Sequence, residues 1–196
     1  MDHTEQLLDK IRFANNNEDI YDKVVSRHNI SRIEGKIKEV LVGEVVDGRN
    51  EKEYQMQDKS FKLSTIASGL KSYVIIRILL DHGYLKEGSL LVIDEPEVHL
   101  HPEWQVKFAE LIVLIMKELK IKILLATHSP FFLEAIEIFS KKYQVMDKTH
   151  YYLAERKETG AVFKSIDSCL EETYQLLAEP IITMQHILDD IEDEEQ

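Results

Sequence analysis

Hydrophobic residues along this chain gather in short runs that flank one longer helical stripe. Residues 90–93 are four successive apolar residues, and residues 121–126 form a second short apolar segment that contains one lysine. Between them, apolar positions recur at helical spacing over roughly five turns, and they are Trp104, Phe108, Leu111, Ile112, Ile115 and Leu119. A strand, a helix and a second strand in this order form a βαβ crossover, which joins two parallel strands. The pattern predicts an α/β fold, and it predicts that the first strand is buried on both faces because it is apolar throughout.

We predict a single domain over residues 1–196, because the chain has no internal repeat and no low-complexity linker. Its segments are a helical packing segment at 1–43, a core at 44–140, and a β-hairpin with terminal helices at 141–196. Ser31 and Glu34 have the spacing of a capping box that begins a helix. The further elements that the pattern predicts are helices at 4–11, 20–25 and 70–82, short strands within 44–63, and two helices near the end, the second beginning after Pro180.

The composition is that of an ordinary soluble globular protein, with 44% hydrophobic and 31% charged residues. The formal net charge of −12 disfavours a chain built mainly to coat nucleic acid, because the phosphate backbone requires clustered cations. A single cysteine, Cys169, excludes an internal disulfide framework. The longest apolar run, residues 111–116, is too short to cross a bilayer, and the amino terminus has no export signal. We therefore expect a cytoplasmic protein that makes no membrane contact.

Two predicted strands end in side chains that can carry chemistry. Asp94 and Glu95 follow the first strand, and His128 follows the second. Chemistry in parallel sheets collects at the carboxyl ends of the strands, and adjacent carboxylates at that place suit Mg²⁺ and a water molecule. A strand that ends in solvated acids before a turn, and a loop histidine without a function, are the alternatives.

A loop of small residues at 64–69 leads into the predicted helix at residue 70. A helix start offers backbone N–H groups, and its dipole favours an anion, so Ser68 and Gly69 are candidates to contact a phosphate. The alternative is that Ser68 is an ordinary N-cap of a buried helix.

Taken together, these motifs resemble those of ABC-type ATPases. Residues 90–96 resemble the Walker B segment, residues 97–102 resemble the D-loop, and residues 126–130 resemble the switch-histidine loop. The motifs E-x-x-L-H-P and T-H-S-P are similar to those of the OLD-like and SMC-related branch of AAA/ABC ATPases. Members of that branch work in DNA repair and in phage defence. The resemblance covers residues 65–139. It implies a partial P-loop NTPase fold, with a largely parallel sheet flanked by helices and additional short β segments.

The resemblance also implies a role for each matching residue. Asp94 would hold Mg²⁺ through its water shell, and Glu95 would orient and deprotonate the water that attacks ATP. His128 would contact the γ-phosphate. Two ATPase domains of this family clamp ATP between them, so Ser68 and Gly69 would contact the nucleotide of the other domain. The partner would be a second copy in a homodimer or a partner ATPase lobe.

The chain departs from the family at two places. Ala67 and Ser68 stand where the family usually has Ser and Gly, and no G-x-x-x-x-G-K-[ST] loop occurs in the sequence. Without that loop nothing cradles the α- and β-phosphates. The resemblance therefore implies the carboxy-terminal part of such an ATPase, which binds ATP and Mg²⁺ only weakly by itself. Truncation, a split protein and a degenerate family member all remain open.

Two other functions fit parts of the sequence. A non-catalytic interaction module would keep the dimerisation surface and regulate a partner ATPase or nuclease. A metal hydrolase would use His99, His101 and Glu103 with Asp94, since His-x-His can supply two zinc ligands. Pro102 and the start of a helix account for that stretch without a metal. No Toprim or HNH-like nuclease motif follows, so a nuclease or a nucleic-acid contact would belong to another domain or chain of a larger system.

Overall fold

The computed structural model of the chain describes residues 27–47, 52–56, 59–62, 65–66, 68–158, 160–167 and 170–194. They belong to two compact units, of which the first ends at Thr127 and the second begins at His128. The predicted helices at 4–11 and 20–25, and Ala67, lie outside the described residues. Of the helices that are described, none is long and apolar enough to cross a membrane.

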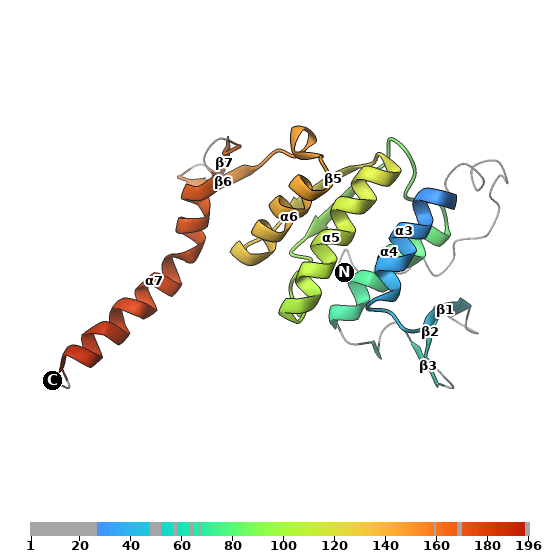
Figure 1. Cartoon of the computed structure of the whole chain (residues 1–196), viewed down its shortest axis with the longest axis horizontal. Helices are drawn as coiled ribbons and strands as arrows, with labels where there is room; N and C mark the ends of the chain where they lie inside the picture. Colours follow the sequence, from blue (N-terminus) through green and yellow to red (C-terminus); the bar gives the residue numbers. More distant parts are fainter. Residues whose placement is uncertain are drawn as a thin grey trace. The chain divides into compact units, whose positions relative to one another are not determined.

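The first unit combines helices with two separate sheets (Figure 1). Its described helices are α3 (Arg27–Lys38), α4 (Ser68–Asp81) and α5 (Pro102–Leu119). Its described strands are β1 (Glu44–Asp47), β2 (Lys52–Met56), β3 (Lys59–Lys62), β4 (Leu90–Asp94) and β5 (Lys122–Ala126).

Strands β4 and β5 form a parallel pair joined by α5, as the order of the apolar segments predicts. Their register places Asp94 opposite Ala126, at the carboxyl ends of both strands. Helix α5 begins with Pro102, where the missing N–H costs nothing, and the Nδ1 atom of His101 accepts a hydrogen bond from the backbone N–H of Glu103 at 3.3 Å. The predicted α/β fold with a parallel sheet and flanking helices is confirmed.

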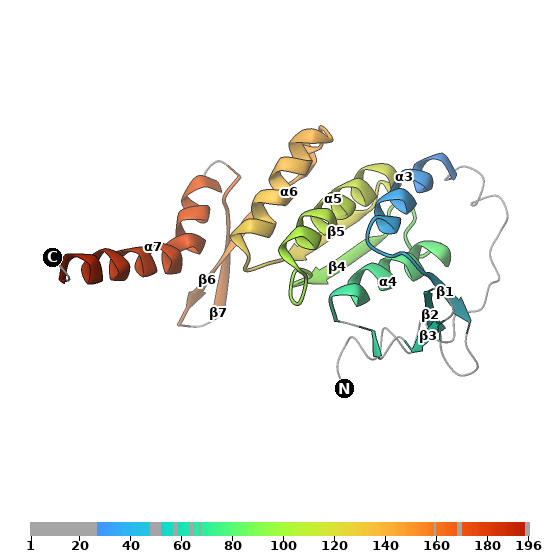
Figure 2. The same ribbon diagram turned by 60° about the horizontal axis from the view of Figure 1, so that its bottom comes forward.

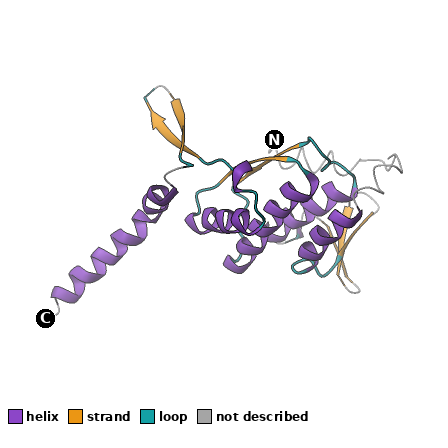
Figure 3. Cartoon of the chain, turned by 45° about the horizontal axis from the view of Figure 1, so that its top comes forward, coloured by secondary structure: helices purple, strands orange, loops and turns teal. Residues whose placement is uncertain are grey.

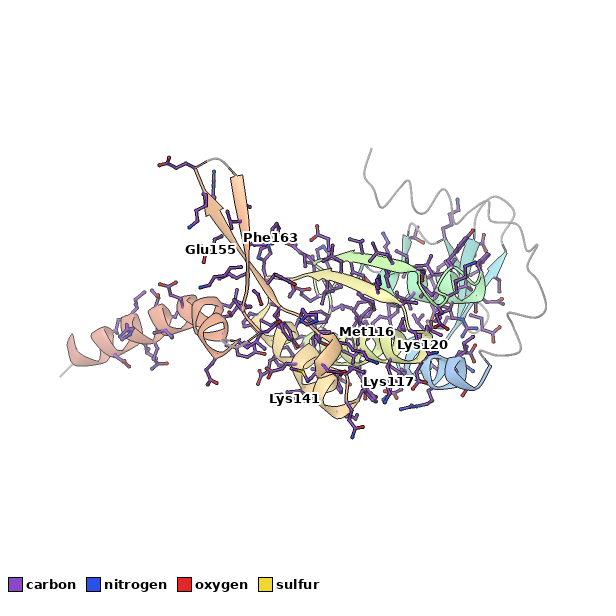
Figure 4. The ribbon with its side chains drawn as sticks, turned by 90° about the horizontal axis from the view of Figure 1, so that it is seen from above. Met116, Lys117, Lys120, Lys141, Glu155 and Phe163 are labelled. Atoms are coloured by element: carbon purple, nitrogen blue, oxygen red, sulfur yellow. The ribbon has the colours of Figure 1, made fainter. Side chains whose placement is uncertain are left out.

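Among the residues that the structure describes, a helix covers only one face of the β4–β5 pair, and the prediction of a strand buried on both faces is wrong. Burial alternates along both strands, and Leu90, Val92 and Leu124 are 63%, 61% and 60% exposed. Figures 2 and 4 show α5 running along the other face of the pair. An apolar run shows that both faces of a strand can be buried. Whether they are buried depends on other elements of the fold, which have to pack on each face.

Helix α5 forms the centre of the core of the first unit, and its middle two turns are buried all round. On one side, the ring of Tyr73 in α4 meets Phe108 edge-on, with 4.9 Å between the ring centroids, and its hydroxyl donates to the carbonyl of Trp104 at 2.9 Å. On another side, Lys36 of α3 pairs with the buried carboxylate of Glu110 at 2.8 Å. The hydrogen bond to Glu110 raises the pKa of Lys36, and the buried acid keeps a charged partner.

Helix α3 begins at Arg27, so the predicted helix start at the capping box of residues 31–34 is wrong. Ser31 lies inside the helix. A serine in a helix interior costs less than about 0.7 kcal/mol relative to alanine, so a local capping pattern does not stop the helix from extending upstream.

The short strands predicted within residues 44–63 are present as an antiparallel meander in the order β1-β2-β3. Tyr54 is the buried residue at its centre, and it pairs with Val45 on one side and with Phe61 on the other. Its hydroxyl accepts a hydrogen bond from the backbone N–H of Gly43 at 2.8 Å, which ties the meander to the chain that leaves α3.

The second unit contains a hairpin between helices. Its described elements are α6 (Pro130–Lys142), a short 3-10 helix (Met146–Lys148), β6 (Tyr152–Lys157), β7 (Gly160–Ser165) and α7 (Leu170–Glu194). Strands β6 and β7 form the predicted antiparallel hairpin, drawn in orange in Figure 3 and carrying the labelled Glu155 and Phe163 in Figure 4.

One continuous helix, α7, takes the place of the two predicted terminal helices. The prediction that a helix begins after Pro180 is wrong, because Pro180 lies inside α7. Figures 1 and 2 show that α7 bends along its length. A proline removes one backbone donor and bends a helix, and the helix continues where the apolar positions on both sides lie on one stripe.

We expect Leu111→Ala to lower the free energy of unfolding of the first unit by about 2–5 kcal/mol, because it leaves a cavity in the core. Leu111 is fully buried, whereas Leu90 is 63% exposed, so Leu90→Ala should cost less than about 1 kcal/mol. Urea denaturation followed by the fluorescence of Trp104, the single tryptophan, measures both losses. Equal losses would contradict the open face of the β4–β5 pair.

Candidate functional site

The carboxyl end of β4 carries two adjacent carboxylates. Asp94 ends the strand, and the backbone N–H of Glu95 donates to the carbonyl of Ala126 at 2.9 Å, which extends the ladder by one bond. Glu95 then adopts a φ of 43°, in the left-handed region, and the chain turns away from the sheet. Both acidic side chains are exposed. The strand pairing therefore fixes the backbone of both acids, and both residues remain exposed.

Residues 95–101 form a compact loop between β4 and α5. The backbone N–H of Leu100 donates to the carbonyl of Glu97 at 3.0 Å, and the side-chain amide of Gln105 in α5 donates to the carbonyl of Leu100 at 3.1 Å. Pro96, Glu97 and Leu100 are buried. The loop that carries the two acids is thus anchored in the core of its unit.

A side-chain hydrogen bond ties this loop to the end of β5. The hydroxyl of Thr127 donates to a carboxylate oxygen of Glu97. A buried carboxylate is costly unless it is hydrogen-bonded, so this contact holds the loop after β4 against the chain that leaves β5. Sequence reasoning missed this role of Glu97. Its place in the E-x-x-L-H-P motif is the only signal that points to it.

The start of α4 packs against the same loop. Gly69, in the first turn of α4, is buried, and a Cβ at its position would lie 2.6 Å from the carbonyl oxygen of His99. Only a glycine allows an approach this close. His99 itself has a φ of 67°, so the loop turns sharply where it meets α4. The helix start at Ser68 and Gly69 is therefore brought to the loop that follows Asp94 and Glu95.

His128 follows β5 by two residues and is the first residue of the second unit. Its side chain is exposed. The next residue, Ser129, caps α6, because its hydroxyl accepts a hydrogen bond from the backbone N–H of Phe132 at 3.1 Å, and Pro130 occupies the first turn. The T-H-S-P stretch thus leads from a strand end directly into a capped helix. Asp94, Glu95 and Gly69 lie around one loop of the first unit, whereas His128 belongs to the second unit.

Carboxylate oxygens are the ligands that Mg²⁺ prefers in proteins, so the exposed side chains of Asp94 and Glu95 fit a hydrated Mg²⁺ and a water molecule. Among the residues that the structure describes, no three His, Cys, Asp or Glu side chains gather closely enough to hold a metal ion by themselves. The alternative zinc set of His99, His101 and Glu103 with Asp94 is therefore not formed. His101 is used as the cap of α5 instead.

Comparison with known protein families matches most of the chain. Residues 10–134 match the family described as "AAA domain, putative AbiEii toxin, Type IV TA system". The matched segment includes α4, β4, the loop of residues 95–101, β5 and His128.

A known bacterial protein shares part of the sequence. The Septu protein PtuA of Bacillus thuringiensis is 35% identical over an alignment of 89 residues, which covers 37% of this chain and 21% of that protein. The chain thus spans about a fifth of the length of the curated relative that it matches.

Two solved structures share the fold. One is an SMC ATPase studied for its ATP-driven dimerisation and DNA-stimulated activation, with a TM-score of 0.52 and 16% identity over 81% of this chain and 92% of that chain. The other is an SMC head bound to the C-winged helix domain of ScpA, with a TM-score of 0.50 and 13% identity over 78% of this chain and 45% of that chain. At these identities the similarity shows the fold alone, which is that of SMC ATPase heads, in the P-loop NTPase class.

Gly69→Ala should lower the free energy of unfolding by about 1–3 kcal/mol, because its Cβ would press against a backbone carbonyl. Gly35→Ala is the matched control. Gly35 also lies in a helix, and a Cβ added there would have nothing within 4 Å. This substitution should raise the free energy of unfolding by about 0.5–1 kcal/mol. Thermal unfolding followed by circular dichroism compares the two variants. A stabilised Gly69→Ala protein would contradict the packing of α4 on the loop.

Glu97→Gln and Thr127→Val should be energetically coupled by about 0.5–3 kcal/mol in a double-mutant cycle. Glu97→Gln replaces a charged acceptor by a neutral amide oxygen, and Thr127→Val removes the donor of the same part-buried hydrogen bond. Glu103→Gln combined with Thr127→Val is the control pair. Glu103 is exposed and pairs with Lys107, so these two changes should add within about 0.5 kcal/mol. Urea denaturation of the single and double variants gives both values. Additive effects at Glu97 and Thr127 would show that the contact does not hold the loop.

Proposed function

Because the chain belongs to the AAA domain family described as putative AbiEii toxin of Type IV TA systems, we propose that it is the carboxy-terminal lobe of an ABC-type ATPase of the OLD-like, SMC-related branch. In this proposal the chain supplies the residues of an ATP site that bind Mg²⁺ and activate the attacking water. The observation that carries the proposal is the pair Asp94 and Glu95 at the carboxyl end of β4, in register with the end of β5. AAA-type and SMC-like ATPases generally use ATP and Mg²⁺.

Each site residue has a role that its position allows. Asp94 binds the water shell of Mg²⁺, which when bound would neutralise negative charge on the phosphates. Glu95, one residue further and exposed, orients the attacking water and accepts its proton. Its backbone is held by the carbonyl of Ala126, so its carboxylate starts from a fixed point at the sheet edge. His128, which follows the neighbouring strand, contacts the γ-phosphate.

The start of α4 serves the nucleotide of a second ATPase lobe. Backbone N–H groups in the first turn at Ser68 and Gly69 offer donors to a phosphate, and the helix dipole favours an anion there. The second lobe belongs to another copy of the chain or to a partner ATPase. The packing of Gly69 on the carbonyl of His99 supports this role, because it joins the phosphate-contacting helix start to the loop that follows Glu95.

The other half of the ATP site comes from a polypeptide segment that carries a phosphate-binding loop. No G-x-x-x-x-G-K-[ST] occurs in the printed sequence, so this chain by itself binds ATP and Mg²⁺ weakly. The open face of the β4–β5 pair supports an incomplete domain, because parallel sheets are normally covered on both faces and contain more than two strands. Leu90, Val92 and Leu124 form the apolar surface on which the remaining part of such an ATPase would pack.

We further propose a cytoplasmic role in phage defence, in a larger system with a nuclease or nucleic-acid partner. The similarity to the Septu protein PtuA supports this setting, and DNA repair is the other setting that the OLD-like and SMC-related resemblance implies. In this proposal the residues 1–196 act as one domain, with the segments 1–43, 44–140 and 141–196.

A non-catalytic regulatory module derived from such an ATPase is the second candidate. The missing phosphate-binding loop favours it, because a module that only binds a partner does not need the loop. The acids Asp94 and Glu95 at the sheet edge favour catalysis, because partner binding alone gives no reason to keep a metal-binding and a water-activating carboxylate together.

The chain alone should hydrolyse ATP no faster than the buffer. When it is combined with a polypeptide that carries the phosphate-binding loop, from the upstream reading frame or from a partner, turnover should appear. Glu95→Gln should then lower kcat by about 10²- to 10⁴-fold with little change in KM, because it removes the proton acceptor and keeps the shape of the site. A phosphate-release assay measures both parameters.

Glu158→Gln, in the exposed turn of the β6–β7 hairpin, is the matched control and should leave kcat unchanged. Robust turnover by the chain alone, abolished by Glu95→Gln, would contradict the proposal that another polypeptide segment must supply the phosphate-binding loop. Full activity of Glu95→Gln in the combined protein would disprove the role of Glu95. Partner binding without turnover in any combination would favour the regulatory module.

A further inference from the structure

The last helix carries a seven-residue repeat that the proposed ATP site does not use. Apolar residues recur at alternating intervals of four and three along α7, at Leu170, Tyr174, Leu177, Ile181, Met184, Leu188 and Ile191. This is the spacing of the a and d positions of a coiled coil, whose seam faces another helix. A repeat kept through the whole helix indicates that the whole length of α7 is built to lie against other helices.

The first part of this seam is used within the second unit. The hydroxyl of Tyr174 donates to the carboxylate of Glu137 in α6, and Thr173 beside it is buried. Leu170 and Leu177 are half-buried. The amino-terminal turns of α7 are thus docked on their own unit.

The residues described in the second part of the seam are exposed. Met184 is 62% exposed, and Ile187, Leu188 and Ile191 are about half exposed. We call these four residues the distal stripe. They lie within one third of the helix circumference, because they are three, four and seven residues apart. A contiguous apolar stripe of this kind on a helix marks an interface, since leaving it in water forfeits the free energy of burial.

The charges around the distal stripe indicate what covers it. From residue 181 to residue 188, His186 is the only titratable side chain, whereas the acids Asp189, Asp190, Glu192, Asp193, Glu194 and Glu195 all follow. A basic partner would be drawn to the acidic end and would leave the neutral stretch with Met184 and Leu188 unmatched. A second neutral, apolar stripe with the same spacing matches it, and another copy of this chain supplies one.

The same charges decide the direction of pairing. In a parallel pair, the six acids of one copy would lie beside the six acids of the other, and like charges at helix–helix distances repel. In an antiparallel pair centred near His186, Met184 of one copy lies against Leu188 of the other, and the acidic ends point away from each other. This arrangement is isologous, as a two-fold dimer requires.

We propose that the distal stripe of α7 is a dimerisation surface, on which the same stripe of a second copy packs in the antiparallel direction. The contact needs no nucleotide, so it is separate from the ATP-dependent pairing of two ATPase lobes. It would hold two chains together at their carboxyl ends while their nucleotide sites are open.

Light scattering after size-exclusion chromatography of the full chain, in buffer without nucleotide or Mg²⁺, tests the proposal. The mass should rise with protein concentration from 22.9 kDa towards about twice that value. Leu188→Lys should raise the dissociation constant of the dimer more than about 100-fold, because it places a charge in the seam of both copies. Met184→Lys is a second variant with the same expected effect.

Ile182→Lys is the matched control. Ile182 lies on the opposite side of α7, is 48% exposed like Leu188, and changes from an aliphatic residue to the same charge. It should leave the dimer intact, and circular dichroism should show the same helix content in all three variants. A monomer at every concentration up to the solubility limit would overturn the proposal. A dimer that Leu188→Lys and Met184→Lys leave intact would also overturn it, because another surface would then hold the copies.

Disulfide cross-linking tests the direction. In a Cys169→Ser background, Ile191→Cys should remain uncross-linked on oxidation, because the two copies of residue 191 lie at opposite ends of an antiparallel seam. Rapid formation of a disulfide-linked dimer through residue 191 would show a parallel pair and would overturn the antiparallel arrangement.

Discussion

The parallel pairing of β4 with β5 is the constraint on which the candidate site depends. The ladder runs to its last residue, with Asp94 opposite Ala126, and one further hydrogen bond fixes the backbone of Glu95. Since parallel strands end at the same edge, the acids after β4 and the polar stretch after β5 leave the sheet at the same level. A slip of one residue in this register would turn the strand over and send the side chain of Asp94 towards α5.

Three contacts hold the loop after β4 in place. The carboxylate of Glu97 receives the hydroxyl of Thr127, Gln105 holds the carbonyl of Leu100, and Gly69 lets α4 approach the carbonyl of His99. Two segments that are distant in the sequence, at Gly69 and at Thr127, therefore meet at one loop. Phosphoryl transfer depends on positioning more than on covalent chemistry, so a firmly held loop beside the acids is what an ATPase of this family needs.

Among the described residues, the β4–β5 pair is covered by a helix on one face and exposed on the other. Its inner face, whose residues are half-buried, lies against α5, while Leu90, Val92 and Leu124 on the other face remain in contact with water. Apolar strands of this kind are stable in large α/β proteins because helices cover both faces. The open face and the lack of a G-x-x-x-x-G-K-[ST] loop in the printed sequence are the observations on which our proposal of one lobe of an ATPase rests.

The sequence by itself determined the elements whose signal is local. The stripe from Trp104 to Leu119 and the two flanking apolar runs specify α5, β4 and β5, because helical and strand periodicities are properties of neighbouring residues. Their order specifies parallel pairing, and with it the common edge at which Asp94 and Glu95 lie. The AAA-type family was also recognisable from the residues at the strand ends, whereas the OLD-like branch stays a prediction.

Only the tertiary structure decided which faces are covered and which contacts hold the loop. The sequence of an apolar strand does not show whether one or both of its faces are packed. Val92 is exposed because no second layer covers the strand among the described residues. The hydrogen bond between Glu97 and Thr127 and the approach of Gly69 to His99 join residues that are about 30 apart in the sequence. Such contacts leave no periodic pattern, because they depend on how the elements pack and not on the order of residues within them.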